Sequence, residues 1–481
     1  MFAGQGSGFA QFGIGLGDMR TAVVNGWQFS QRSPVPADEA RAREPIAQAS
    51  IEGRRWREVI DRWFAVERPA IQAAVAEVVV VDPTTLEDDG LLGHIEDVQQ
   101  LMYRAADHHF EHISLFAIVG ELVLECRGWG IRAEDAVSLL RGASPASDEA
   151  ARSLRPVIEA LRSAGVRPAS LDDVRSASPA ARAGLEAHLH TFGLRLVGGF
   201  DVCDVSLAEV PETVLATIVS ALDSPADRDA DDDADIRAAV PAGDRARFDD
   251  LLAAARACYG VRDDDVAPLM TARGAYRRAL VAVGSRWSLA DPAHVFEADF
   301  HEIVEGLAGG SRPTPEELEE RAALRERQAV AIVPPFLGDP PEPPDLSNLP
   351  PAVRRLTEGF LAYGQLMFQA GRQHMQGFGV GTRTVRGRAR VVHRAEEALS
   401  DLEPGDILVT SMTTPAFNAV LPLAGALATQ EGGLLSHAGI IARELDIPAA
   451  IGVGGLLSSV VDGDEIEVDA AAGTVTIIAA R

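Results

Sequence analysis

Lysine is absent from this chain of 481 residues, in which all 44 basic residues are arginine. The absence excludes a Schiff-base lysine, a P-loop lysine and an ATP-gripping lysine anywhere in these residues. An arginine-biased genome is the simpler cause, but the chemical consequence is the same. Any phosphate must be bound by arginine, by backbone N–H groups or by a partner.

Cysteine is scarce and long apolar runs are missing. The three cysteines, Cys126, Cys203 and Cys258, are widely spaced and form no metal-binding pattern, as expected of reduced core thiols in the cytoplasm. No apolar run reaches the length of a membrane span, and the N-terminus lacks the regions of a signal peptide. A net charge of −27 argues against nucleic acid or an acidic membrane surface as a partner. We therefore expect a cytoplasmic protein without a metal site.

The chain is long enough for two to four domains, and its hydrophobic fraction of 47% is that of a globular protein. Apolar residues over most of its length are spaced as in helices. The spacing predicts helices over residues 45–79, 93–126, 148–164, 178–191, 211–222, 243–258, 265–288 and 352–373. Residues 22–29 are typical of a strand, the acidic run 227–235 of a solvated loop, and the proline-rich run 334–351 of a connector.

One histidine, His437, lies directly after a glycine-rich loop and at the start of an apolar-periodic stretch. The preceding Ser436 is a good N-cap, so the pattern predicts a helix that begins here and ends soon after Asp446, before Pro448. The residues expected on the buried face of this helix are Ile440, Ile441 and Leu445.

The loop before the helix suits a phosphate carried on the imidazole. Gly432 and Gly433 permit close backbone approach, and the first N–H groups of a helix favour anions. A histidine at such a position can also be an ordinary exposed capping residue, because glycine-rich turns before helices are common. The local pattern alone leaves both interpretations open.

The run Thr-Gln-Glu-Gly-Gly-Leu-Leu-Ser-His-Ala at residues 429–438, followed by Ala-Arg-Glu-Leu-Asp-Ile-Pro-Ala at residues 442–449, resembles a known signature. It is similar to the phosphohistidine motif of the phosphoenolpyruvate-utilising enzymes, with Gln430 in place of the usual aspartate and Leu435 in place of the threonine of dikinases. The resemblance implies that His437 carries a phosphoryl group. The phosphate contacts that it implies are Thr429, Gly432, Gly433, Ser436 and Arg443, the last of which alternatively pairs with Glu444 and neighbouring carboxylates.

The flanking residues resemble the rest of the family's swivelling domain. Residues 379–392 are similar to its entry strands, residues 402–410 to a turn and a buried strand, and residues 413–415 to a Thr-x-Pro loop, with Phe417 as the nearby aromatic residue. Residues 462–469 and 474–478 alternate as a closing hairpin does. The expected hinge consists of Gly377, Gly379 and Gly381.

The helical region has looser resemblances, to rifampicin phosphotransferase-like enzymes. The segments that carry them are residues 25–29, 190–195, 201, 209–215, 276–278 and 291–296, with Gly199 in place of a family glutamate. In those enzymes this region binds the phosphate acceptor, which implies Arg195 as a contact of the substrate or the phosphate. The alternative is that Arg195 caps a helix or pairs with Asp201.

Three histidines, His108, His109 and His112, fall on one predicted helix, with His109 and His112 three residues apart on one face. Two such ligands are too few for a metal site. A substrate-binding role as the base that accepts the proton of an acceptor hydroxyl suits them better, and a partly buried helix histidine is the alternative. His188 and His190, which flank the Arg195 segment, leave the same choice open.

Together these resemblances predict a multidomain protein of class α + α/β. A large, mostly helical acceptor-binding domain at residues 1–345 is expected first. A proline-rich linker and connecting helix at residues 346–377 would then lead into a compact β/β/α swivelling phosphohistidine domain at residues 378–481.

The layout is similar to that of rifampicin phosphotransferase without its ATP-grasp domain, because only about 20 residues precede the Asn25 strand. The TIM barrel of the dikinases is missing too. We therefore expect a separate ATP-grasp partner, of the pyruvate phosphate dikinase type, to phosphorylate His437 and a hydroxylated small molecule in the helical domain to receive the phosphoryl group. The chain itself is expected to bind no cofactor, with ATP and Mg²⁺ at the partner. Transient substrate phosphorylation for dehydration or condensation, and a non-catalytic phosphocarrier or regulatory protein, are the alternatives.

Overall fold

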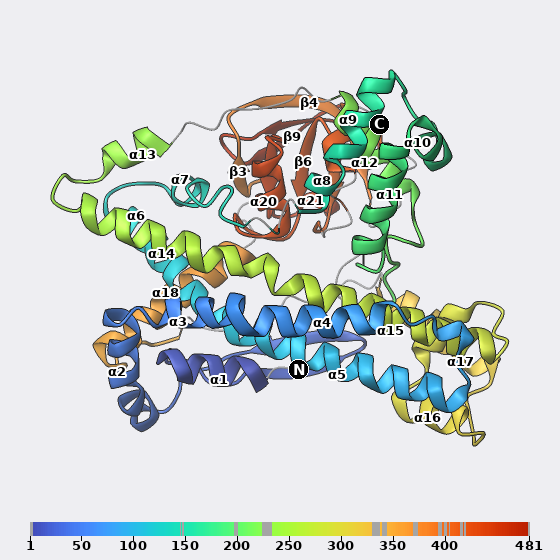
Figure 1. Ribbon diagram of the computed structural model, residues 1–481. Helices are drawn as coiled ribbons and strands as arrows, with labels where there is room; N and C mark the ends of the chain where they lie inside the picture. The colour runs from blue at the N-terminus through green and yellow to red at the C-terminus, as the bar shows by residue number, and fades with distance from the viewer. Residues whose placement is uncertain are drawn as a thin grey trace. The chain divides into compact units, whose positions relative to one another are not determined.

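The computed structural model describes residues 3–144, 146, 149–196, 201–223, 233–329, 337–338, 344–368, 374–392, 397–398, 402–403, 405–413, 417 and 420–479. The chain forms two compact units (Figure 1). The first consists of Met1–Ser114, Asp201–Cys203 and Asp265–Thr357, and the second of Leu115–Phe200, Asp204–Asp264 and Glu358–Arg481. Each unit joins segments that are distant in the sequence. The domain boundaries at residues 345 and 378 stay predictions.

The first unit is built almost entirely of helices. Its elements are α1 (Ala3–Phe12), β1 (Arg20–Val24), β2 (Trp27–Gln31), α2 (Ala37–Glu52), α3 (Arg55–Arg62), η1 (Trp63–Glu67), α4 (Arg68–Val79), η2 (Pro83–Thr85), α5 (Asp88–His112), α15 (Val266–Arg286), η4 (Pro292–Glu297), α16 (Phe300–Leu307), α17 (Pro315–Ala329) and the start of α18 (Pro351–Phe368). Figure 1 shows α4, α5 and α15 running side by side. Small side chains on α15 are completely buried and allow this close packing: Ala272, Ala275 and Ala279.

Two predicted helices of this region are broken into shorter ones. The predicted helix over residues 45–79 is interrupted after Gly53, because Arg54 adopts a left-handed conformation with φ 52°. A π-helical turn, η1, follows α3 before the chain continues as α4. The predicted helix over residues 93–126 is divided by the 3₁₀ turn η3 (Ile113–Leu115), which separates α5 from α6 (Phe116–Gly128).

The strand-like segment at residues 22–29 is a hairpin rather than one strand. β1 and β2 pair antiparallel, with Val24 opposite Trp27. The turn between them is Asn25-Gly26, and both residues have positive φ, 51° and 81°. Asn-Gly is the sequence preferred in two-residue turns of this kind, so the signal was present in the sequence.

The second unit contains a helical part and a sheet. Its helices are α6, α7 (Ala133–Ser138), α8 (Glu149–Ser153), α9 (Arg155–Ala164), α10 (Leu171–Ala177), α11 (Pro179–Phe192), α12 (Glu212–Asp223), α13 (Asp233–Ala239), α14 (Arg245–Asp264), the rest of α18, α20 (His437–Glu444) and α21 (Leu456–Ser459). A separate apolar core joins α9, α10, α11 and α12. The fully buried residues at its centre are Val157, Leu161, Val174, Ala181, Leu185 and Ile218.

The sheet of the second unit has seven strands in the order β3-β7-β6-β5-β4-β8-β9. The strands are β3 (Phe378–Val380), β4 (Thr384–Val391), β5 (Ile407–Thr410), β6 (Ala426–Thr429), β7 (Ala449–Ile451), β8 (Glu465–Asp469) and β9 (Thr474–Ala479), with the 3₁₀ turn η6 (Leu421–Leu423) before β6. The central strands β4, β5, β6 and β7 pair parallel, and β3, β8 and β9 are added antiparallel at the edges.

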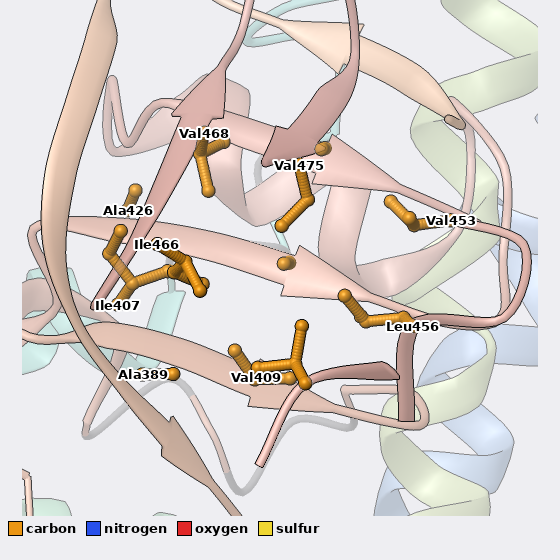
Figure 2. Close-up of a cluster of buried hydrophobic side chains, with 12 residues drawn as sticks. Ala389, Ile407, Val409, Ala426, Val453, Leu456, Ile466, Val468 and Val475 are labelled. Carbon is orange, nitrogen blue, oxygen red and sulfur yellow. The ribbon is translucent and has the colours of Figure 1, made fainter. Parts of the chain in front are cut away.

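Strands β5, β6 and β7 are buried along their whole length, as the apolar runs Ile-Leu-Val-Thr of β5 and Ala-Leu-Ala-Thr of β6 require. Figure 2 shows side chains from these strands and from β8 and β9 converging on one core. The residues labelled there are Ala389, Ile407, Val409, Ala426, Val453, Leu456, Ile466, Val468 and Val475. The sheet is therefore a rigid base for the loops at the ends of β5 and β6.

The predicted fold class is confirmed: a large helical part accompanies a compact mixed α/β part. The entry strands and the closing hairpin lie where the sequence indicated them, as β3, β4, β8 and β9. Most of the acidic run 227–235, much of the proline-rich run 334–351 and the end of the helix predicted over residues 352–373 lie outside the described residues. In the described part of the chain, no helix combines the length and the apolar character that a membrane span needs.

Candidate phosphohistidine site

Helix α20 begins at His437, directly after the N-cap Ser436. The Ser436 hydroxyl accepts a hydrogen bond from the Gly439 N–H at 3.4 Å, as predicted for a capping serine. The helix ends at Glu444, two residues before the predicted end. Asp446, with φ 53°, turns the chain left-handed, and the Ile447 N–H returns to the Ala442 carbonyl at 2.8 Å, which closes the helix as a Schellman motif.

The buried face of α20 is only partly as predicted. Ile440 and Ile441 are buried, with exposed fractions of 5% and 8%. The prediction that Leu445 belongs to this face is wrong, because it lies beyond the last helical residue and its side chain is 38% exposed.

The glycine loop before α20 packs against the C-terminal turn of α18. The Gly433 N–H donates to the Met367 carbonyl at 3.1 Å, and the Leu435 N–H donates to the Leu366 carbonyl at 2.9 Å. A Cβ atom at Gly433 would lie 2.2 Å from the Leu366 carbonyl oxygen, so only glycine allows this approach. Gly432 has φ 99°, a conformation that also favours glycine. The close backbone approach predicted for Gly432 and Gly433 is therefore present, and the backbone that Gly433 approaches belongs to α18.

The two ring nitrogens of His437 differ in their surroundings. Nδ1 is 2.8 Å from the hydroxyl of the buried Thr413, which follows β5. Nε2 is buried and has no hydrogen-bond partner among the described residues. Burial, reinforced by the positive charge of Arg262, lowers the pKa of His437 to about 3. The imidazole is therefore neutral at physiological pH and presents one unpaired nitrogen.

Polar side chains of α14 and α18 gather near this imidazole. The Arg262 guanidinium lies 3.5 Å from the Tyr259 hydroxyl and 3.6 Å from the Asp263 carboxylate, and it shares a hydrogen bond with Tyr363. Burial disfavours the charge of Arg262, but Asp263, Tyr259 and Tyr363 together outweigh that effect and hold the pKa of Arg262 above its usual value. Arg262 therefore stays a cation at neutral pH, and its charge acts on the His437 imidazole.

Comparison with known proteins gives two family matches. Residues 402–473 match the mobile domain of the PEP-utilising enzymes, and residues 146–283 match the fourth domain of rifampicin phosphotransferase. Residues 402–473 are therefore similar to a PEP-utilising mobile domain, and this segment is called the mobile domain below. The first match covers β5, β6, α20 and the His437 loop, and the resemblance predicted from the sequence is confirmed.

Individual relatives agree with these matches. Rifampicin phosphotransferases of Streptomyces sviceus and of a further Streptomyces species are 28% and 30% identical over 62% of this chain. The phosphoenolpyruvate synthase of Aeropyrum pernix is 44% identical over 18% of this chain. The matched residues make up 34%, 35% and 11% of those relatives, so the chain spans about a third of the length of the rifampicin phosphotransferases that it matches.

Two further residues predicted to hold phosphate in this mobile domain have other contacts in the structure. The Thr429 hydroxyl is completely buried, donates to the Glu431 carbonyl at 2.9 Å and accepts from the Gly452 N–H at 3.3 Å. Arg443 is buried and donates to the Leu434 carbonyl at 3.1 Å. These three hydrogen bonds hold the backbone of the loop and its neighbours in place. Direct phosphate contacts by Thr429 and Arg443 stay predictions.

Sequence reasoning did not place Thr413 or Arg262 in the site. Thr413 had a signal, since it begins the Thr-x-Pro loop of the family resemblance, but Thr414 and Pro415 lie outside the described residues. The sequence contained no signal that Arg262 lies near the site, because its helix, α14, is far from His437 in the sequence. Only the fold brings α14, α18 and the glycine loop together.

The predicted histidine pair lies in the first unit around one carboxylate. His109 Nδ1 is 3.0 Å from Asp265 Oδ1, and His112 Nδ1 is 2.9 Å from Asp265 Oδ2. The Asp265 side chain is completely buried, and although burial opposes it, the two histidines hold the pKa of Asp265 below its usual range. His112 is completely buried, whereas the His109 side chain is 17% exposed. Of the pair, His109 is the one that a small molecule can reach.

A second carboxylate lies on the other side of His112. Glu67 Oε2 is 3.9 Å from His112 Nε2 and 3.7 Å from His108 Nδ1, and Arg62 donates to Glu67 at 2.7 Å. The Trp63 ring packs edge-on against His112, with 5.0 Å between ring centroids. Among the described residues, no group of three histidine, cysteine or acidic side chains is arranged to hold a metal ion.

Arg195 lies in the helical part of the second unit. Its guanidinium is 3.4 Å from the Glu149 carboxylate and stacks over the Phe192 ring at 4.4 Å. Burial lowers the pKa of Arg195. The pKa of His188 is lowered to about 4, chiefly by burial and further by the positive charge of Arg195. His188 Nδ1 is 2.7 Å from the Ser153 hydroxyl. The substrate contact predicted for Arg195 stays a prediction, with Glu149 as its ion-pair partner here.

The three cysteines are free thiols, with Cys126 and Cys258 buried and Cys203 half-buried. Burial raises the pKa of Cys126 to about 11, so this thiol stays protonated at neutral pH.

Proposed function

We propose that this chain is the phosphohistidine component of a phosphotransferase. The observation that carries the proposal is the imidazole of His437, whose Nδ1 is held by Thr413 at 2.8 Å while Nε2 is buried and unpaired. The matches to the PEP-utilising mobile domain and to rifampicin phosphotransferases support it. His437 would accept a phosphoryl group and pass it to a hydroxylated small molecule.

In the first step, Nε2 is the nucleophile. When the Nδ1–H donates to the Thr413 hydroxyl, the lone pair of the neutral ring is on Nε2. That lone pair attacks a phosphorus of ATP. The bond from this phosphorus to its bridging oxygen breaks, and the bridging oxygen leaves with the electron pair. The positive end of α20 lies at His437 and favours the negative charge of the phosphoryl group that Nε2 then carries.

In the second step, an alcohol replaces the imidazole on phosphorus. The acceptor oxygen forms the new P–O bond, the P–N bond breaks, and its electrons return to Nε2. The hydroxyl proton passes to a base, for which we propose His109. Asp265 fixes His109 Nδ1 at 3.0 Å as a proton donor, which leaves the other ring nitrogen as the acceptor.

The phosphoryl donor is proposed to be an ATP-grasp domain on a separate protein, which would hold ATP and Mg²⁺. The 481 residues contain no lysine to bind ATP phosphates, and the two matched segments resemble a mobile domain and the fourth domain of rifampicin phosphotransferase. The hinge proposed for the movement between donor and acceptor includes Gly377 and Gly379, whose Cβ positions are filled by neighbouring backbone in this arrangement.

The test combines the chain with radiolabelled ATP and the ATP-grasp domain of a rifampicin phosphotransferase, and then with rifampicin as the acceptor probe. Wild type is expected to gain acid-labile label, and His437→Ala none. A matched control is His301→Ala, which removes a histidine that is 78% exposed and should leave labelling unchanged. Equal labelling of wild type and His437→Ala would contradict the proposal. Label that stays on the protein in the presence of every acceptor would favour a phosphocarrier.

A further inference from the structure

The cluster of Tyr259, Arg262, Asp263 and Tyr363 has no part in the two steps described above. Tyr259 and Tyr363 are buried, and Arg262 is 15% exposed. Removing an arginine from water costs free energy unless its N–H groups are well paired. The half-buried Arg262 has contacts of 3.5 Å with Tyr259 and 3.6 Å with Asp263 besides its hydrogen bond to Tyr363, so a closer anionic acceptor would pair it better. A phosphoryl group is the anion that a guanidinium fork binds best.

Helix α18 connects this cluster to the phosphohistidine loop. Its residues Leu366 and Met367 hold the loop through their carbonyl groups. Tyr363 precedes them by three and four residues, so it lies on the same face of the helix, one turn away. The Tyr363 ring is fixed by stacking on Phe116 at 4.6 Å between centroids, and its hydroxyl group hydrogen bonds with Arg262. The guanidinium is thus placed beside the loop by a continuous series of contacts.

The unpaired atom of His437 supplies an independent observation. Nε2 is buried without a hydrogen-bond partner among the described residues, although buried polar atoms are nearly always paired. The charge of Arg262 also acts on this imidazole, where it opposes protonation. A cation beside a nitrogen disfavours a proton there and favours a phosphoryl group, whose net charge is negative.

We propose that Arg262, with the hydroxyl groups of Tyr259 and Tyr363, binds the phosphoryl group carried on Nε2 of His437. The proposal rests on the proposed function and adds the residues that hold its intermediate. Arg262 would exchange its contact with the Asp263 carboxylate for the phosphoryl oxygens, and the tyrosine hydroxyls would donate to the same oxygens. The cation for the phosphohistidine is then supplied by the helical part of the second unit and not by the mobile domain.

The experiment uses the full chain and phosphoramidate, a small anionic phosphoryl donor that needs neither a partner protein nor an acceptor. Labelling of His437 is followed over time, and the phosphoryl group is titrated by ³¹P NMR. In Arg262→Gln we expect labelling to slow about tenfold or more, the effect of losing one charge-assisted hydrogen bond. The ³¹P titration midpoint should shift to higher pH, because the neighbouring cation that favours the dianion is gone.

Two further variants separate this role from a loss of folding. Tyr363→Phe keeps the ring stacked on Phe116 and removes only the hydroxyl, so it should slow labelling about threefold. Arg247→Gln removes an arginine of the same helix whose partner is Glu125, and it should label like wild type. Wild-type labelling and an unchanged ³¹P midpoint in Arg262→Gln would overturn the proposal and leave the phosphohistidine intact. Failure of the wild type itself to label at His437 would instead refute the proposed function.

Discussion

At the scale of single residues, we propose that Thr413 selects the nitrogen of His437 that reacts. Its hydroxyl lies 2.8 Å from Nδ1, and the residue is 6% exposed. A neutral imidazole carries one proton, and the nitrogen that is hydrogen-bonded to an acceptor keeps it. When the Thr413 hydroxyl accepts from Nδ1–H, the reactive nitrogen is Nε2, and it is set by a residue outside the glycine-histidine motif.

Replacing Thr413 by valine should slow phosphorylation of His437 by phosphoramidate about fivefold, the effect of one ordinary hydrogen bond. The reason is that the proton then distributes over both nitrogens, so that Nε2 is less often a nucleophile. Labelling rates and the ¹⁵N shifts of the His437 ring measure the two effects together. Ser411→Ala, which removes a neighbouring exposed hydroxyl bound to Glu431, is the control and should change neither. An unchanged ring tautomer in Thr413→Val would contradict the assignment.

At the scale of elements, the contact of the glycine loop with α18 fixes where α20 begins. The Gly433 N–H and the Leu435 N–H both donate to carbonyl groups of the last turn of α18. These carbonyls lie in the last described turn of α18, and the two N–H groups of the loop pair with them. The loop before α20 is thus tied to α18 by two backbone hydrogen bonds.

Gly433→Ala should destabilise the second unit by about 1–3 kcal/mol, as overpacking does, because its Cβ atom would lie 2.2 Å from a backbone oxygen. Chemical unfolding followed by circular dichroism measures the change. Gly364→Ala is a matched control in the interior of α18. It meets nothing within 4 Å and should stabilise by about 0.5–1 kcal/mol, since alanine favours helix. Equal stabilities for the two variants would show that the loop does not pack on α18 in solution.

Local sequence patterns predicted most elements of the fold but not the surroundings of the site. The Ser436 cap, the start of α20 and the hairpin of β8 and β9 depend on neighbours in the chain, and all are present. The early end of α20 depends on Asp446, which adopts a left-handed conformation that aspartate only sometimes takes. Arg262 and Tyr363 lie in unrelated helices, and their approach to His437 depends on packing between elements, which periodicity does not encode.

At the scale of the whole molecule, two neutral buried histidines make the second unit sensitive to acid. His437 has its pKa lowered to about 3 and His188 to about 4, each chiefly by burial, against 6.5 for a free histidine. Below pH 6.5 these two histidines bind protons in the unfolded chain but stay neutral in the folded chain, so the free energy of unfolding falls as the pH falls. Their contribution is complete above about pH 6.5 and is lost progressively as the pH falls toward 3 to 4.

The expected slope is up to about 1.4 kcal/mol per pH unit for each histidine well below pH 6.5. Unfolding by urea at pH 7, 6 and 5 measures it. The double variant with His188→Gln and His437→Gln should lose stability less steeply than wild type between pH 6 and 5. The variant His301→Gln should retain the wild-type slope, because the His301 side chain is 78% exposed in the folded chain. Equal slopes in wild type and the double variant would mean that both rings are solvated in the folded protein, and Nε2 of His437 would then not be the shielded nucleophile that the proposed transfer requires.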